Sequence, residues 1–207
     1  MARRIEGVSD QLLRCAREEF MEMGFQEASL RVIAAKAGTS TGSIYTRYGD
    51  KDGLFRALTE EAVEGLIQSF ESAQSAFDNR PAESKGDALD YASEQVAEMV
   101  NYFYDHLDAF RLLARCSDTD HFDRMMDHLI DIDVKYTSRF LQCTGREALA
   151  AGQTGELMLH ILSSAYYSGL FETIRHGLSR EDAIAYARRL RRFFRMGWAD
   201  LLGMEKG

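Results

Sequence analysis

The chemically most informative residues of this sequence lie in one short segment, residues 41–48, which reads TGSIYTRY. If this segment is a helix, its exposed side carries hydroxyl groups, an aromatic ring and a guanidinium. These come from Thr41, Ser43, Tyr45, Thr46 and Arg47. Such groups suit the base edges, thymine methyls and phosphates that line a DNA major groove. The segment therefore predicts a surface that reads nucleic acid.

Two short helices joined by a three-residue turn would hold this surface in place. The first is expected over residues 30–37 and the second over 41–48. Gly38 can adopt the left-handed backbone that the turn needs. Ile33 and Ile44 fall at positions that point into a small core between the two helices. The pattern predicts a helix-turn-helix, with Ser29 as the cap of its first helix.

Helical spacing of apolar residues runs through the rest of the chain, and no strand alternation interrupts it. Ser9 is the predicted N-cap of the first helix, and Asp50 caps the helix that follows the helix-turn-helix. The segment around Pro81, the only proline, breaks the pattern. The predicted fold is all-α with about nine helices, over residues 9–23, 30–37, 41–48, 51–77, 88–105, 109–115, 119–143, 156–176 and 180–202. We expect a first domain over residues 1–50 and a second over 51–207, with 51–77 as the linking helix.

Charge is distributed unevenly along the 207 residues, whose formal net charge is −8. The segment from Ala28 to Leu58 holds five basic and two acidic residues, so a locally basic region sits on an acidic chain. Three scattered cysteines favour a reduced, cytoplasmic protein without a disulfide framework. The longest charge-free stretch, Leu157 to Phe171, is too short to span a bilayer. We expect no membrane partner and no secretory signal.

The segment that includes Gly24-Phe25, Ile33-Ala34, Ala37-Gly38 and the run from Gly42 to Leu54 resembles the DNA-binding domain of the TetR family of transcriptional regulators. The resemblance covers about residues 8–60, and it differs at Arg47-Tyr48, where the family usually has His-Phe. It implies a recognition helix over residues 41–48 and a phosphate contact by Lys51. The DNA-contacting residues that it implies are Ser29, Arg31, Thr41, Ser43, Tyr45, Thr46, Arg47, Tyr48 and Lys51. The implied partners are an operator in double-stranded DNA, a second copy of the chain and a small-molecule effector.

The larger part of the chain resembles the family only in layout, as a variable helical domain that binds a small molecule and dimerises. Aromatic, methionine and histidine residues suit a pocket for a small, largely apolar ligand. The candidate lining residues are Tyr102, His106, Phe110, Met125 and Tyr166. The last two helices carry apolar stripes typical of a four-helix interface between two subunits. The candidate interface residues are Ile161, Ala165, Ala187, Leu190, Phe194 and Trp198.

The sequence therefore predicts a dimeric, ligand-responsive repressor with no catalytic residue, cofactor or metal. One alternative is an activator or a ligand-independent DNA-binding protein of the same fold. Another is a helical enzyme or metal-binding protein, for which the acidic face formed by Asp120, Asp123, Asp127 and Asp131 is the only candidate site. We interpret that face as solvated. The arginines of residues 188–195 are interpreted as partners of acidic neighbours rather than as a second nucleic-acid surface.

Overall fold

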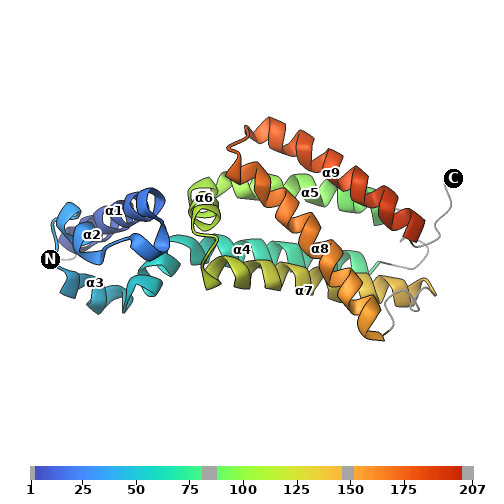
Figure 1. Ribbon diagram of the computed structural model, residues 1–207, viewed down its shortest axis with the longest axis horizontal. Helices are drawn as coiled ribbons and strands as arrows, with labels where there is room; N and C mark the ends of the chain where they lie inside the picture. The colour runs from blue at the N-terminus through green and yellow to red at the C-terminus, as the bar shows by residue number, and fades with distance from the viewer. Residues whose placement is uncertain (1–2, 81–87, 146–151, 202–207) are drawn as a thin grey trace. The chain divides into compact units, whose positions relative to one another are not determined.

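The computed structural model describes residues 3–80, 88–145 and 152–201, and in these ranges the chain is built from nine α-helices and no strands (Figure 1). The predicted all-α fold is confirmed. The helices are α1 (Arg3–Glu27), α2 (Leu30–Lys36), α3 (Thr41–Tyr48), α4 (Lys51–Asp78), α5 (Ala88–Asp105), α6 (Leu107–Arg115), α7 (Asp120–Cys143), α8 (Gly152–Arg175) and α9 (Arg180–Leu201).

The helices form two compact units that do not follow the chain in a simple order. The smaller unit comprises Met1–Glu64 together with Asp108–Asp123, and the larger comprises Gly65–Leu107 together with Arg124–Gly207. Helix α4 is continuous and contributes its first half to the smaller unit and its second half to the larger one. The first domain expected from the sequence ends at residue 50, whereas the smaller unit also contains residues 51–64 and 108–123.

The core of the smaller unit is an aromatic cluster beneath the short helices. Phe20 of α1 and Phe55 of α4 are fully buried, and their rings meet edge to face with centroids 5.3 Å apart. Phe25 stacks on Phe20 at 5.7 Å. Ile33 and Ile44 are also fully buried, as their positions in the pattern predict. Burying such side chains contributes about 1.5–3 kcal/mol each, so this core fixes how α2 and α3 sit on α1 and α4.

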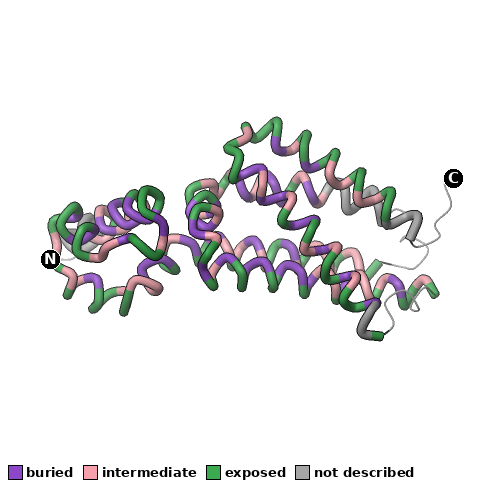
Figure 2. The backbone as a smooth tube through the Cα atoms, viewed as in Figure 1, coloured by how far each residue is buried: buried purple, intermediate pink, exposed green. Residues whose placement is uncertain are grey.

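In the larger unit, α9 packs along α5 and α8 (Figure 1), and buried residues recur along each of these helices (Figure 2). Phe103 of α5 and Phe171 of α8 are almost completely buried, with ring centroids 4.9 Å apart. A polar cluster lies among these apolar residues. The Ser163 and Tyr167 hydroxyls donate to the Asp133 carboxylate at 2.6 Å and 3.1 Å. Burial raises the pKa of Asp133, although these two hydrogen bonds and the charge of Arg191 oppose the shift.

Several helix ends differ from the sequence predictions. Helix α1 begins at Arg3, so Ser9 lies inside it and is not the N-cap. The Ser9 hydroxyl lies 3.1 Å from the Tyr48 hydroxyl, so a tertiary contact accounts for this serine. Helix α8 begins at Gly152, four residues before the predicted start, and α6 begins at Leu107. Propagation of an existing helix adds one hydrogen bond for each residue, so a helix can extend past a weak local stop signal.

Within the described residues, no helix combines the length and the apolar character needed to cross a membrane.

Candidate functional site

The turn between α2 and α3 has the geometry of a helix-turn-helix. Gly38 has a φ of 64°, the left-handed conformation that the sequence predicts for it. The Thr39 amide donates to the Ala34 carbonyl at 2.9 Å and closes the end of α2. Ser40 then caps α3, because its Oγ accepts from the Ser43 amide at 3.2 Å. Thr41 is therefore the first helical residue rather than the cap, and α3 begins where the sequence predicts.

The outward side of α3 carries the polar residues that the sequence singled out. Tyr45 is 56% exposed, and Thr46 and Arg47 are exposed beside it. Thr41 and Ser43 are half-buried. The Thr46 hydroxyl donates to the Gly42 carbonyl at 2.8 Å, so its oxygen lone pairs and methyl group are what it presents outward. This surface offers donors, acceptors, a ring and a guanidinium on one short helix.

The basic residues of the helix-turn-helix region have different surroundings. Arg31 and Arg47 are exposed and form no ion pair with the residues that the structure describes. Lys51 is half-buried, because its ammonium donates to the carbonyls of Gln26 at 2.9 Å and Ala28 at 3.4 Å. The same ammonium lies 4.9 Å from the centre of the Phe25 ring. Lys51 therefore ties the end of α1 to the start of α4, and a phosphate would compete for its remaining N–H.

Two further predicted DNA-contacting residues, Ser29 and Tyr48, also make contacts within the protein. Ser29 occupies the N-cap position of α2, but its side chain makes no capping hydrogen bond, contrary to the prediction. Its backbone amide donates instead to the buried Glu19 carboxylate at 3.3 Å. This hydrogen bond pairs one of the backbone N–H groups that the start of a helix leaves without an intrahelical partner. Tyr48 is half-buried and reaches Ser9 of α1 through its hydroxyl. Both residues position α2 and α3 through these contacts.

Sequence reasoning missed an ion pair between an exposed lysine of α2 and a buried glutamate of α1. The Lys36 ammonium lies 2.9 Å from the Glu19 carboxylate, whose side chain is 5% exposed. The hydrogen bond to Glu19 raises the pKa of Lys36. Seventeen residues separate the two groups, so no helical spacing relates them. The only available signal was an acidic residue on the otherwise apolar face of α1.

Sequence reasoning also missed the part that residues 108–123 play in the smaller unit. The Arg115 guanidinium donates to the carbonyls of Met21 at 3.2 Å and Glu22 at 3.3 Å, near the end of α1. His121 of α7 lies 2.7 Å from Asp52 of α4, and its ring stacks on Phe55 with centroids 5.0 Å apart. These contacts brace the helix-turn-helix from behind and join it to a distant segment of the chain.

The four aspartates of the acidic face of α7 are exposed, as a solvated helix face should be. They are Asp120, Asp123, Asp127 and Asp131. His121, which the sequence places beside that face, turns inward and is only 9% exposed in its side chain. In the described part of the chain, no three His, Cys, Asp or Glu side chains are placed to hold a metal ion.

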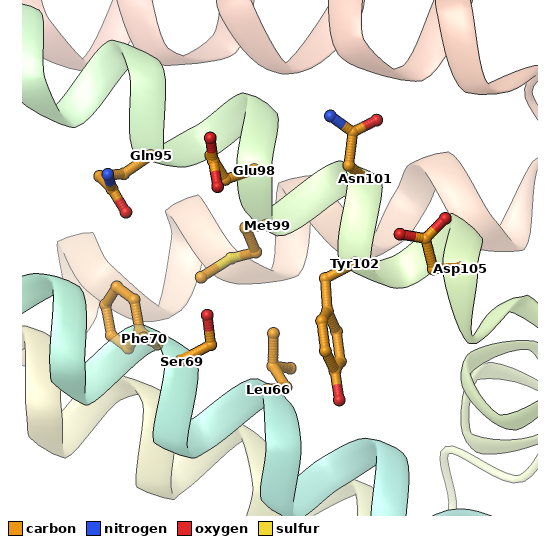
Figure 3. Close-up of a pocket in the computed structure, with 9 residues that line it drawn as sticks. All are labelled: Leu66, Ser69, Phe70, Gln95, Glu98, Met99, Asn101, Tyr102 and Asp105. Atoms are coloured by element: carbon orange, nitrogen blue, oxygen red, sulfur yellow. The ribbon is translucent and has the colours of Figure 1, made fainter.

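A pocket of about 270 Å³ lies between α4 and α5 in the larger unit (Figure 3). Among the predicted ligand residues, Tyr102 lines this pocket. His106 lies beside Tyr102, with ring centroids 4.4 Å apart. Met125 and Tyr166 are buried in the larger unit, whereas Phe110 is fully buried and belongs to the smaller one. The nine lining residues are Leu66, Ser69, Phe70, Gln95, Glu98, Met99, Asn101, Tyr102 and Asp105.

The predicted interface residues fall into two groups. Ile161 and Ala165 are exposed on α8, in line with Leu157, which is 55% exposed. Ala187 is fully buried inside the chain and has no surface to offer to a second copy. Leu190 and Phe194 are half-buried, and the Phe194 ring meets Tyr166 at 5.2 Å. The Trp198 side chain lies outside the described residues. Among the described side chains of α9, Phe193 has the most exposed ring, at 72%.

Comparison with known proteins agrees with this geometry. Residues 12–58 match the family described as bacterial regulatory proteins, tetR family. The chain is 29% identical over 96 residues to the HTH-type transcriptional regulator BetI of Stenotrophomonas maltophilia, covering 46% of this chain and 43% of BetI. It is 41% identical over 56 residues to the HTH-type transcriptional repressor Rv1474c of Mycobacterium tuberculosis, covering 27% of this chain and 30% of that protein. The matches thus span less than half the length of these curated relatives.

The fold is also found among solved structures. A TetR-like transcriptional regulator from Rhodococcus sp. RHA1 superposes with a TM-score of 0.54 at 21% identity, covering 95% of this chain and 96% of that one. The likeness at this identity shows a shared fold over nearly the whole chain. Residues 12–58 thus combine a helix-turn-helix geometry with outward-facing polar residues and a sequence match to the tetR family of bacterial regulatory proteins, and the fold is that of a solved TetR-like regulator.

Proposed function

We propose that this protein is a ligand-responsive transcriptional repressor that binds a near-palindromic DNA operator as a dimer. The observation that carries the proposal is the outward face of α3, where Tyr45, Thr46 and Arg47 are exposed on a helix-turn-helix of the tetR family. In this proposal α3 enters the major groove and reads base edges. Arg31, exposed near the start of α2, binds the DNA backbone.

A dimer is proposed because α8 and α9 both expose large apolar side chains. Leu157 and Ile161 of α8 are 55% and 54% exposed, and Phe193 and Met196 of α9 are 72% and 56% exposed. Several large apolar side chains exposed on two adjacent helices are typical of a protein–protein interface, where a second copy of the chain would bury them. Two α8–α9 pairs would form a four-helix bundle and hold two recognition helices at a fixed spacing.

The proposed effector is a small molecule that binds in the larger unit, and α4 transmits its effect. The continuous helix α4 starts beside the helix-turn-helix at Lys51 and contributes Leu66, Ser69 and Phe70 to the pocket. A ligand that prefers the conformation unsuited to DNA lowers operator affinity by its differential binding energy, typically about 1–3 kcal/mol.

The DNA proposal is tested by selecting binding sites from a random pool of DNA duplexes with the full-length dimer. We expect an inverted repeat to be enriched. Tyr45→Ala should change the selected sequence, because Tyr45 reads bases. Arg31→Ala should weaken binding to all sequences alike and reduce the salt slope by about one. Arg111→Ala, which removes an equally exposed arginine of α6, is the matched control and should alter neither.

Failure to enrich any sequence would refute DNA reading by this chain. Uniform weakening by both Tyr45→Ala and Arg31→Ala would refute the division between reading and positioning.

The effector response has its own test, because the coupling between effector binding and operator binding is reciprocal. An effector that lowers operator affinity must lose affinity for the operator complex by the same factor, as calorimetry on both forms can measure. Equal affinity for both forms would show that the bound molecule is not an effector.

A further inference from the structure

The lining of the pocket between α4 and α5 has a consistent chemical character (Figure 3). Leu66, Phe70 and Met99 supply apolar walls, and the Tyr102 ring hangs from α5 toward α4 in the close-up. Two carboxylates, Glu98 and Asp105, complete the charged part of the lining, and none of the described residues that line the pocket is basic. The lining is therefore acidic and aromatic at once.

The two carboxylates lie on one side of α5, seven residues and about 10 Å apart along the helix axis. Asp105 is neutralised, because the Arg180 guanidinium lies 2.7 Å from its carboxylate. Glu98 has no cation within reach among the described residues. Its side chain is exposed and lines the pocket. The uncompensated charge of the pocket is thus that of Glu98.

The close approach of α5 to α4 is built into the sequence at Gly65. A Cβ at this position would overlap the Tyr102 hydroxyl, so glycine leaves room for the tip of the tyrosine side chain against α4. The ring is held in place as one wall of the pocket, with Phe70 contributing a second aromatic face. Polar and apolar side chains both line the cavity, and its carboxylate and aromatic faces attract an organic cation and repel an anion.

We propose that the pocket between α4 and α5 binds a small organic cation with an apolar body, such as an aryl-substituted amine or quaternary ammonium. Glu98 binds the positive group, and Leu66, Phe70, Met99 and Tyr102 enclose the apolar body. The cavity of about 270 Å³ is just below the usual range for drug-sized ligands, so the ligand is small. This inference rests on the proposed effector response and specifies the chemistry of its ligand.

The test uses three probes of similar size and different charge on the full-length protein without DNA. They are benzyltrimethylammonium, its uncharged carbon isostere neopentylbenzene, and phenylacetate. Calorimetry should show binding of the cation, weaker binding of the neutral compound and none of the anion. Glu98→Gln should weaken the cation about fivefold and leave the neutral compound unchanged. Glu61→Gln, the same change at an exposed position of α4 away from the pocket, is the matched control.

Phe70→Leu tests the aromatic contribution separately, because it keeps an apolar wall and removes the ring face. It should weaken the cation about threefold and the neutral compound far less. Equal binding of the cation and the neutral compound, no binding of the cation, or an unchanged cation affinity in Glu98→Gln would overturn the proposed ligand class.

A parallel gel-shift assay with the selected operator separates this inference from the proposed function. If the cation binds with the expected dependence on Glu98 and leaves operator affinity unchanged, the ligand class is supported and the effector response is refuted. If the operator is bound but the neutral compound and the cation bind the pocket equally, the ligand class fails and the DNA-binding proposal stands.

Discussion

Replacing Gly53 with alanine should destabilise this protein, although such a change in a helix normally does the opposite. Alanine is about 1 kcal/mol more favourable than glycine inside a helix. A Cβ at Gly53, however, would lie far inside 3.0 Å from the Tyr48 carbonyl oxygen, a contact that real Cβ atoms do not make. Both groups are anchored in backbone, so the end of α3 must move away from the start of α4.

The magnitude follows from two opposing contributions. Overpacking costs about 1–3 kcal/mol, and a clash between two groups anchored in backbone lies at the upper end of that range, at about 3 kcal/mol. The helix-propensity gain offsets about 1 kcal/mol of that cost. We expect a net loss of about 2 kcal/mol, which lowers the melting temperature of a chain of this size by about 4–8 °C. Operator affinity should fall as well, because Tyr48 ends the recognition helix.

Gly42→Ala is the matched control for this measurement. It makes the same chemical change within the same helix-turn-helix, but its Cβ would have only the Ser40 hydroxyl nearby, at an ordinary 3.7 Å. Its melting temperature should be unchanged or higher by up to about 4 °C. Differential scanning fluorimetry on both variants and the wild type decides the question. A Gly53→Ala protein that melts at or above the wild-type temperature would show that the inferred overlap does not constrain the fold.

Three further predictions concern the braces and surfaces of the two units. Burial raises the pKa of Asp133, so the stability contributed by its protonated form is complete below its ordinary pKa of 3.8 and is lost as the pH rises. Asp133→Asn should therefore gain stability relative to the wild type as the pH rises above 3.8, and a difference in melting temperature that does not vary with pH would contradict this. Phe193→Asp should give a folded monomer by sedimentation, whereas Ala187→Asp should unfold the larger unit, because only the first position is exposed. Arg115→Ala should lower stability by about 1 kcal/mol and speed hydrogen exchange near the end of α1, and unchanged exchange there would argue against its bracing role.

The helices and the helix-turn-helix could be predicted from the sequence because their signals are local. Apolar residues repeat at helical spacing, and Gly38 marks the turn with the positive φ that it adopts. Asp50 caps α4 as predicted, since its carboxylate accepts from the Gly53 amide at 2.7 Å. Each of these signals connects residues only a few positions apart. The missed helix ends show the limit of such local signals, because α1 and α8 begin several residues before the positions at which the sequence predicts their starts.

The pocket and the braces behind the helix-turn-helix depended on the tertiary structure. Arg115 reaches the Met21 carbonyl across 94 positions of sequence, and no periodicity links such residues. Lys51 resembles a free phosphate-binding lysine in sequence, yet the fold brings the carbonyls of Gln26 and Ala28 to its ammonium. Which residues line a cavity is also decided by helix pairing. Of five aromatic, histidine and methionine candidates, the packing of α4 against α5 left Tyr102 lining the pocket described here, because the others are enclosed elsewhere or lie behind it.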